Sequence, residues 1–351
     1  MKEKKYLRIY RYLRKKIEDG DYGNDARLPS KRDLAQMFGV SVITVEHAYD
    51  ILCQEGYAVS KERKGYFTDY RKETAFASAL SMPEHVLQTT GTAAEVTFPF
   101  SVLAKTARFI LSEYAEHLLA RTESAGALFL RETISDYLAR SRGMHVSPEQ
   151  IIIGSGAQNL YQLLVLLLGR EKKFACESPS YEKIFETYAA SGVNCELLPL
   201  HTDGIAADAL QRTSADVLHI TPYRSYPSGV TASASKRREY LAWVQEGERY
   251  IVEDDFSSEF TVSSKVDDTL FSMDKTGRII YINTFTATIS PAIRTAYAVL
   301  PPELAARYYR EFSFFSCSVP TFEQYLVAEL IRRGEFERHV NRMRRHLRKE
   351  K

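Results

Sequence analysis

Apolar residues recur every three or four positions along the first part of the chain, which is the spacing of amphipathic helices. The spacing predicts one helix over residues 4–19, a second from Lys31 to Phe38 and a third that ends near Gln54. Ser30 and Ser41 stand just before the second and third helices, where serine is a preferred N-terminal cap. The residues expected to face inward are Tyr6, Ile9, Tyr10, Leu13, Ile17, Leu34, Ala35, Phe38, Val45, Ala48, Tyr49 and Leu52.

Two short β-like stretches, 57–60 and 66–70, follow the third helix and enclose the basic segment from Lys61 to Gly65. Three helices and a basic hairpin together predict a winged helix-turn-helix domain over residues 1–70. In such a domain the third helix enters the major groove of DNA, and the hairpin contacts the backbone or the minor groove.

From about residue 96 the pattern changes to short β-rich runs that alternate with helical stretches. This alternation predicts an α/β body over 96–351 with a mainly parallel sheet, in which ligands bind beyond the carboxyl ends of the strands. The segment 71–95 has weak periodicity and is expected to be a linker. The expected strands are 151–153, 174–176, 195–199, 217–220, 250–252, 279–282 and 297–299, and helices are expected at 157–168, 181–190 and 235–245.

The composition is that of a globular protein, with 44% hydrophobic and 26% charged residues in 351. The longest aliphatic run, residues 163–168, is far shorter than the ~20 apolar residues that a membrane helix needs. The N-terminus lacks the apolar segment of a secretory signal. The four cysteines are far apart and form no CxxC pair, which argues against a disulfide framework or a zinc site and fits a reducing cytoplasm.

Positive charge is concentrated at the two ends of the chain. Residues 1–73 hold 16 Lys and Arg against 12 Asp and Glu, residues 331–351 hold 9 against 3, and the remainder holds 22 against 30. A basic head on an acidic body suggests a head that binds a polyanion. The alternative is that these basic residues only keep a surface helix in solution.

Three predicted strand ends carry polar groups that suit an anionic ligand. The turn from Gly154 to Gln158 precedes a helix, and the free N–H groups at a helix N-terminus favour a phosphate, although glycine-rich turns are common. The adjacent carboxylates at 253–255 are costly unless a cation lies beside them. Arg294, which follows the strand at 279–282, is a candidate to complete an anion site.

The head resembles bacterial repressors of the GntR type over residues 28–68, LPSKRDLAQMFGVSVITVEHAYDILCQEGYAVSKERKGYFT. The resemblance implies binding to duplex operator DNA, and the alternative is a winged helix with no role in DNA binding. The implied DNA contacts are Ser30, Lys31, Arg32, Ser41, Val42, Ile43, Thr44, His47, Arg63, Lys64 and Gly65.

One position of the head departs from the family pattern, because Val42 stands where an arginine is usual. The start of the third helix therefore offers no long donor to a guanine edge, which is the commonest specific contact. We expect Val42 or Ile43 to contact thymine methyl groups instead, and Lys31, Lys61 and Arg63 to contact phosphates. His47 is either a DNA contact or an ordinary solvated helix residue.

Nearly the whole chain is similar to the MocR subfamily of GntR regulators, in which a fold-type I aminotransferase-like body follows the winged helix. The similar stretches are FPF (98–100), LRETISDYLARSRGMHVSPEQIIIGSGAQ (130–158), ESPSY (177–181), TPYRSYPSGVT (221–231), VEDDFSSEF (252–260), TFTATISPAIRTAYAVLP (284–301) and GEFERHVNRMRRH (334–346). The similarity implies a site for pyridoxal 5′-phosphate (PLP). The implied residues are Ser155, Gly156, Ala157, Gln158, Thr284, Thr286 and Arg294 around the phosphate, Tyr181 stacked on the pyridine ring, Asp254 paired with the ring nitrogen, and Phe256.

Several departures from this family bear on chemistry. Ala287 stands at the position of the Schiff-base lysine, so the amine that would attach PLP and transfer protons is missing there. Phe256 lacks the hydroxyl of the family's tyrosine, and Tyr226 replaces the superfamily's asparagine before Pro227. The family's small C-terminal domain, which carries an arginine for the substrate carboxylate, is expected to be missing. Ala287 is either a natural loss or an engineered change.

We therefore expect a bacterial, cytoplasmic transcription regulator that associates with the nucleoid when it binds its operator. It would act as a homodimer, bind no metal, and sense PLP, or an adduct of PLP with an amino compound, without catalysis. One alternative is a PLP-dependent aminotransferase with an accessory DNA-binding head. Another is a degenerate regulator that binds no cofactor.

Overall fold

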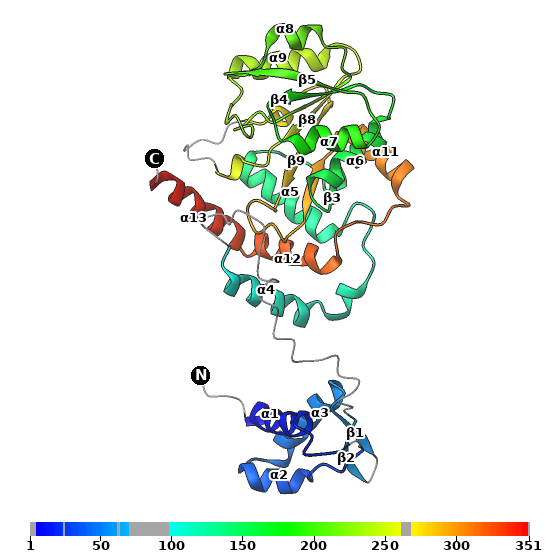
Figure 1. Ribbon diagram of the computed structural model, residues 1–351, viewed down its shortest axis with the longest axis vertical. Helices are drawn as coiled ribbons and strands as arrows, with labels where there is room; N and C mark the ends of the chain where they lie inside the picture. The colour runs from blue at the N-terminus through cyan, green and yellow to red at the C-terminus, as the bar shows by residue number, and fades with distance from the viewer. Residues whose placement is uncertain (1–4, 24, 62–63, 70–97, 261–267, 350–351) are drawn as a thin grey trace. The chain divides into compact units, whose positions relative to one another are not determined.

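A computed structural model describes residues 5–23, 25–61, 64–69, 98–260 and 268–349. The described residues fall into two units, a head and a body, on either side of segment 70–97 (Figure 1). The predicted linker at 71–95 lies outside the described residues. No helix within the described ranges has both the length and the apolar character needed to cross a membrane.

The head contains three helices and a two-stranded antiparallel hairpin, at nearly the predicted bounds. Ser30 caps the second helix in a reciprocal capping box with Asp33, and Gly39 ends that helix with φ of 61°, a left-handed conformation that glycine adopts easily. The Ser41 hydroxyl accepts the N–H of Thr44 at the start of the third helix. The elements are α1 (Lys5–Glu18), α2 (Lys31–Phe38), α3 (Val42–Gln54), β1 (Ala58–Lys61) and β2 (Gly65–Thr68).

The body is built on an eight-stranded sheet of order β3-β10-β9-β8-β7-β4-β5-β6. Strands β9, β8, β7, β4 and β5 run parallel, whereas β10 is antiparallel to both of its neighbours and β6 is antiparallel to β5. The expected, mainly parallel sheet is thus confirmed. The strands are β3 (Ile151–Gly154), β4 (Phe174–Ser178), β5 (Cys195–His201), β6 (Gly204–Ile205), β7 (Val217–Ile220), β8 (Tyr250–Asp254), β9 (Ile279–Thr284) and β10 (Ala296–Val299).

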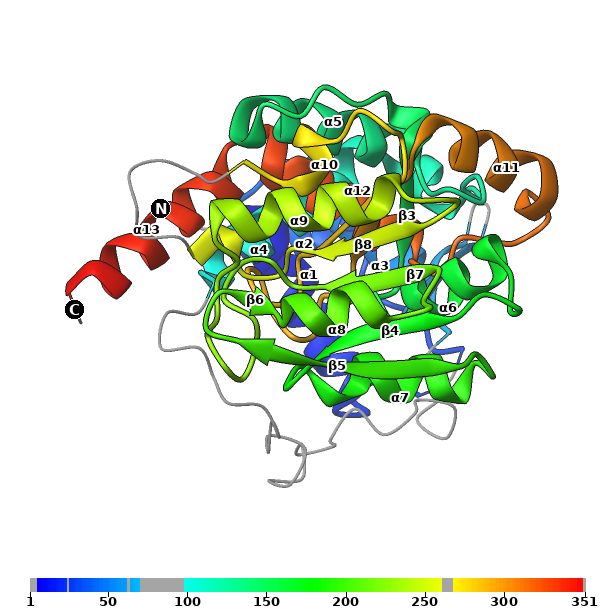
Figure 2. The same ribbon diagram turned by 90° about the horizontal axis from the view of Figure 1, so that it is seen from above.

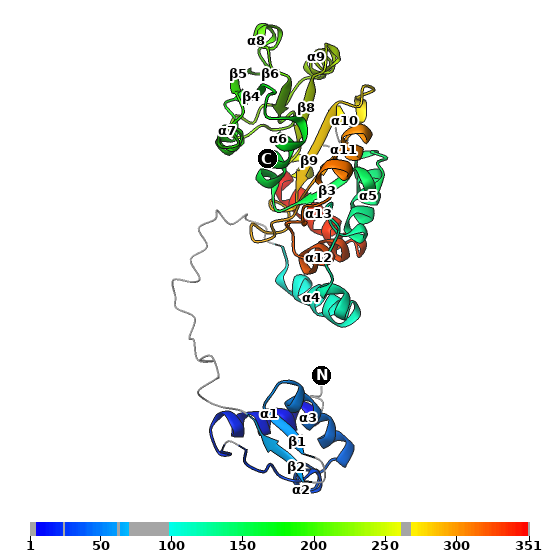
Figure 3. The ribbon, with the colours of Figure 1, turned by 90° about the vertical axis from the view of Figure 1, so that its right-hand side faces the viewer.

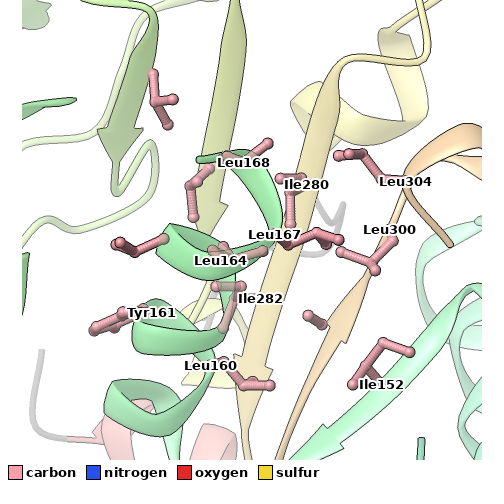
Figure 4. Packing of buried hydrophobic residues seen from close by; sticks show 14 of the residues in the cluster. Ile152, Leu160, Tyr161, Leu164, Leu167, Leu168, Ile280, Ile282, Leu300 and Leu304 are labelled. Atoms are coloured by element: carbon pink, nitrogen blue, oxygen red, sulfur yellow. The ribbon is translucent and has the colours of Figure 1, made fainter. Parts of the chain in front are cut away.

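Helices cover both faces of this sheet (Figures 2 and 3). Alternate strand residues point to opposite faces, so Ile152 packs against α6 while Ile151 and Ile153 pack with α5 and α12. On the α6 face, Leu164 and its helical neighbours lie against Ile282 (Figure 4). The helices are α4 (Phe100–Glu113), α5 (Leu128–Arg142), α6 (Ala157–Leu168), α7 (Glu182–Ala190), α8 (Ala207–Arg212), α9 (Ala234–Gln245), α10 (Leu270–Met273), α11 (Pro302–Phe312), α12 (Thr321–Arg332) and α13 (Glu335–Lys349), with 3-10 turns at Ala115–Leu119, Pro148–Gln150 and Ser258–Phe260.

The sheet topology brings three functional strand ends to one edge. Because β10 is antiparallel to both β3 and β9, strand β3 runs in the same direction as β9 and β8. The carboxyl ends of β3, β8 and β9 therefore lie at the same edge, which is where open α/β sheets bind ligands.

Candidate functional site

A cavity of about 480 Å³ opens at this carboxyl edge of the sheet. It is lined by eight of the ten predicted cofactor residues, and Ser155 and Gly156 lie outside its lining. The lining residues are Ala157, Gln158, Tyr161, Tyr181, Lys183, Ile184, Tyr226, Asp254, Phe256, Thr284, Thr286, Ala287, Pro291 and Arg294. The structure thus gathers segments that are far apart in the sequence around one space.

Asp254 ends strand β8 and is buried beside the cavity. Its Oδ2 accepts a hydrogen bond from the Tyr161 hydroxyl and lies 3.5 Å from Nε2 of His219. His219 in turn shares a 2.7 Å hydrogen bond with Tyr188 through Nδ1. The other carboxylate oxygen, Oδ1, has no hydrogen-bond partner among the described residues. A buried acceptor left without a donor is costly, so this oxygen suits a ligand N–H.

Arg294 lies at the N-terminus of helix α6. A Cβ at Gly156 would come within 2.6 Å of the Arg294 Nη2, so the guanidinium reaches this close only because residue 156 is glycine. The helix begins without a side-chain cap, which leaves the N–H groups of its first turn free of such a partner. The N–H of Ser155, just before this helix, is not free in the same way, because it donates to Oδ1 of Asn159 and to Oγ of Ser318. A guanidinium beside free helical N–H groups favours an anion such as phosphate.

The loop after strand β9 carries two threonines and the alanine at the expected lysine position. The Thr284 hydroxyl donates to Thr286 Oγ1, and the Thr286 hydroxyl donates to the carbonyl of Ile293, each at 3.0 Å. These bonds hold the loop that leads to Arg294. Ala287 lines the cavity, whereas Lys275, the nearest lysine before it in the sequence, does not.

Asp255, the last of the three adjacent carboxylates at the end of β8, has a buried cation beside it. Arg142, buried on α5, places Nη2 3.3 Å from Asp255 Oδ2 and 3.6 Å from Glu259 Oε1. Burial nevertheless raises the pKa of Asp255 to about 6 and that of Glu253 to about 8. The sequence indicated that a cation was needed, but not which residue supplies it.

Glu177 on β4 gives a pH-dependent prediction. Burial raises the pKa of its carboxyl to about 7 from the ordinary 4.5, and Ser225 donates a hydrogen bond to it. The folded protein keeps this proton while the unfolded chain loses it, so the free energy of unfolding should fall as pH rises from about 4.5 to about 7. The contribution of the Glu177 carboxyl to this decrease in the free energy of unfolding would reach about 3 kcal/mol.

Glu177→Gln should remove this part of the pH dependence. Urea unfolding near pH 5 and near pH 8 would be followed by the fluorescence of Trp243, the single tryptophan, which is buried in the body. The parent chain should lose more stability between the two pH values than the variant does. An equal loss in both proteins would contradict the assignment.

The third helix of the head presents the expected apolar residues to solvent. Val42 and Ile43 are 40% and 77% exposed at the start of α3, as a thymine contact requires. The His47 ring stacks on Tyr6 with centroids 4.2 Å apart, so its role as a DNA contact stays a prediction. The remaining predicted contacts that the structure describes are Ser30, Lys31, Arg32, Ser41, Thr44, Lys64 and Gly65.

Two lysines of the head that are predicted to contact DNA phosphates form ion pairs with acidic residues of the head itself. Lys31 forms a 2.5 Å ion pair with Glu46, and Lys61 forms one of the same length with Asp25. Arg63 lies outside the described residues. Exposed pairs of this kind are weak, so both lysines remain available to DNA phosphates.

Several residues of the site carry no recognisable signal in the sequence. Tyr161 was indistinguishable from the apolar residues of its helix, although its hydroxyl fixes Asp254. Lys183 and Ile184 lie on α7 and Pro291 lies in a loop, and no sequence signal connects these three with the cavity. Tyr226 was noted only as a departure from the superfamily's pattern, and the structure places it in the cavity lining. Only their common location in the fold shows that they belong together.

Comparisons with known proteins find a family model for the head and relatives that cover nearly the whole chain. The family model described as "Bacterial regulatory proteins, gntR family" matches residues 5–68. The uncharacterized HTH-type transcriptional regulator YdeL of Bacillus subtilis (strain 168) is 30% identical over 99% of this chain and 77% of its own length. The probable rhizopine catabolism regulatory protein MocR of Rhizobium meliloti is 29% identical over 97% of this chain and 74% of its own length.

A solved structure matches the body. LysN, the α-aminoadipate aminotransferase of Thermus thermophilus complexed with N-(5′-phosphopyridoxyl)-L-leucine, is 27% identical with a TM-score of 0.61. The match covers 71% of this chain and 64% of that chain, so this chain spans just under two thirds of its length. The body therefore has an aminotransferase-like fold.

Proposed function

Because the chain belongs to the MocR subfamily of GntR-type transcription regulators, we propose that its body binds PLP, or an adduct of PLP with an amino compound, and thereby controls DNA binding by its head. The observation that carries this proposal is that one cavity is lined both by Asp254, whose buried Oδ1 has no hydrogen-bond partner among the described residues, and by Arg294, which lies beside the uncapped N-terminus of α6. The Asp254 oxygen suits a cationic ring N–H, and Arg294 suits a phosphate.

The residues present fit this cofactor. Asp254 would hold the protonated pyridine nitrogen, and Tyr161 keeps the carboxylate in place. Arg294, with Ala157 and Gln158 at the start of α6, would hold the phosphate, and Tyr181 would cover the ring. PLP bound in this way is an electron sink, which is the chemistry that the cofactor supplies.

Sensing is favoured over transamination by Ala287. A methyl group at this position neither attaches the cofactor nor transfers a proton, so the cavity keeps the groups that bind and orient a ligand but lacks an amine there. We propose that ligand binding favours one of two arrangements of a homodimer on paired half-sites, in the bacterial cytoplasm.

An absorption and calorimetric titration of the full chain with PLP tests the cofactor part of this proposal. We expect saturable binding with one site per chain, no mass increase at the site after borohydride reduction, and much weaker binding of pyridoxal, which lacks the phosphate for Arg294. Binding of PLP no stronger than that of pyridoxal would contradict the proposal.

DNA binding by the head should depend strongly on salt. Its basic residues displace counterions from DNA, so the logarithm of the association constant should fall linearly with the logarithm of salt concentration. We propose that Lys64, an exposed residue of the hairpin, contacts a phosphate, so Lys64→Gln should reduce this slope by about 1. Lys105→Gln, an exposed change on the body, serves as the control. Binding that does not respond to salt would exclude the head as a DNA-binding unit.

A further inference from the structure

The last helix of the body, α13 (Glu335–Lys349), carries a concentration of positive charge to which the preceding sections give no role. Residues 339–348 hold four arginines and two histidines and no acidic residue. The rest of the body has the opposite balance, because residues 74–330 hold 22 Lys and Arg against 30 Asp and Glu. The second half of the helix extends to the edge of the body (Figures 1 and 2).

The helix packs on the body through one face and presents its arginines on the other. Residues at helical spacing on the inner face, Phe336, Val340 and Met343, are buried. On the opposite side Arg338, Arg342 and Arg345, here called the outer stripe, recur at the same spacing and are exposed. Because the body already covers the apolar face, the outer stripe is the part of α13 that is available to a partner.

Two arginines of the outer stripe keep their charge. Arg338 is paired with an acidic residue of its own helix, but neither Arg342 nor Arg345 forms an ion pair with a described residue. The Arg345 Nε donates to the carbonyl of Asn341, which is neutral. Nη2 of Arg342 lies 3.2 Å from Nδ1 of His339, and burial lowers the pKa of this histidine to about 4, so the ring is uncharged at neutral pH.

Stabilisation of the helix itself does not explain both of these arginines. Cations near a helix C-terminus interact favourably with the helix dipole, but this effect is confined to the last turn. The last turn of α13 covers residues 346–349, and Arg342 and Arg345 precede it. Their charge therefore suits a partner outside the described chain.

The spacing of the outer stripe favours duplex DNA as that partner. Helix residues three or four positions apart have Cβ atoms about 5–6 Å from each other, so the stripe suits an anion with closely spaced charges. Duplex DNA carries one phosphate charge per about 1.7 Å of its axis. A lipid surface is disfavoured, because an amphipathic helix binds lipid through its apolar face, and that face of α13 is buried on the body.

We propose that the outer stripe of α13 binds phosphates of duplex DNA and makes the body a second DNA-contact surface besides the head. This inference goes beyond the proposed function, because it does not require PLP. Contacts to phosphates add affinity and salt dependence but read no bases. The head would therefore supply the sequence preference, and α13 would add affinity for any duplex.

The salt dependence of DNA binding by the full chain tests this proposal. In Arg342→Gln/Arg345→Gln, the slope of the logarithm of the association constant against that of salt concentration should be smaller by about 2, one for each lost phosphate contact. An operator selected from a random duplex library and a random-sequence duplex should both bind about 10-fold more weakly. Arg342→Lys/Arg345→Lys should keep the slope of the parent chain, because a phosphate contact needs only a cation.

The matched control is Arg307→Gln/Arg310→Gln on α11. It removes the same charge from two arginines that form ion pairs with Glu311. The control should keep the slope of the parent chain, and all of these variants should give the same PLP titration as the parent. The result for α13 is thus independent of whether the cofactor proposal holds.

Equal slopes in the parent chain and in Arg342→Gln/Arg345→Gln would overturn the proposal, even if the variant bound less DNA, because a less stable protein loses active molecules and not phosphate contacts. An equal decrease of slope in the α11 control would show that net charge alone is responsible. A greater loss of affinity for the operator than for the random-sequence duplex would mean that the stripe reads bases. Unchanged slopes, with binding to phosphatidylglycerol vesicles by the parent chain alone, would assign the stripe to a lipid surface.

Discussion

Replacing Ala287 with lysine should convert reversible PLP binding into covalent attachment. Ala287 lines the cavity together with Asp254 and Arg294, so a lysine there extends its amine toward a cofactor held by those residues. The amine condenses with the PLP aldehyde with loss of water, and borohydride makes the bond permanent. We expect mass spectrometry to find the phosphopyridoxyl group on the peptide that contains residue 287, with one group per chain.

The matched control for this experiment is Ala292→Lys. Ala292 lies in the same loop and is exposed, but it does not line the cavity. Modification there should be no greater than on surface lysines. If Ala287→Lys gains no more of the group than Ala292→Lys does, residue 287 does not face a bound cofactor.

Replacing Asp254 with asparagine should weaken PLP binding about 100-fold. The change keeps the shape and an acceptor for the Tyr161 hydroxyl, but it removes the buried negative charge that would face the ring nitrogen. Loss of one partner from a buried charged pair costs about 2–5 kcal/mol, which corresponds to this range of affinity. The dissociation constant from a PLP titration measures the effect.

The control for Asp254→Asn is Asp208→Asn, which removes an exposed carboxylate that forms an ion pair with Arg212. Both variants should show the same thermal unfolding of the head, and the control should bind PLP like the parent chain. Undiminished PLP affinity in Asp254→Asn would mean that the ring nitrogen lies elsewhere.

Local sequence patterns predicted the head well because its structure is set by short-range interactions. Ser30 and Ser41 cap the helices that they precede, and Gly39 supplies the left-handed residue between them. The predicted bounds of α2 therefore match the structure to the residue, and α3 ends at Gln54, near which it was predicted to end. The DNA-contact roles are not local properties and stay predictions.

Local patterns could not predict the arrangement of the body's sheet. The apolar run at 297–299 predicted strand β10, but no local signal shows that it lies antiparallel between β3 and β9. That arrangement sets the direction of β3, and so it brings the start of α6 to the same edge as Asp254. Strand order is decided by packing between distant segments, as in the case of Ile152 and Ile282 in one core cluster.

The candidate site was predicted where a motif marked it and missed where only packing reveals it. Asp254, Arg294 and Ala287 lie in stretches with family resemblance, and all line the cavity. Ser155 lies in such a stretch too, but its N–H is engaged by Asn159 and Ser318. Tyr161 and Lys183 look like ordinary helix residues in the sequence.

The central claim is that a ligand in the body controls DNA binding by the head. Its most direct test is the dissociation constant of the full chain for an operator, selected from a random duplex library, with and without saturating PLP at fixed salt. We predict at least about a 5-fold change in the parent chain, which is the lower range of allosteric coupling, and none in Asp254→Asn. An identical constant with and without PLP, under conditions in which PLP is shown to be bound, would contradict the account.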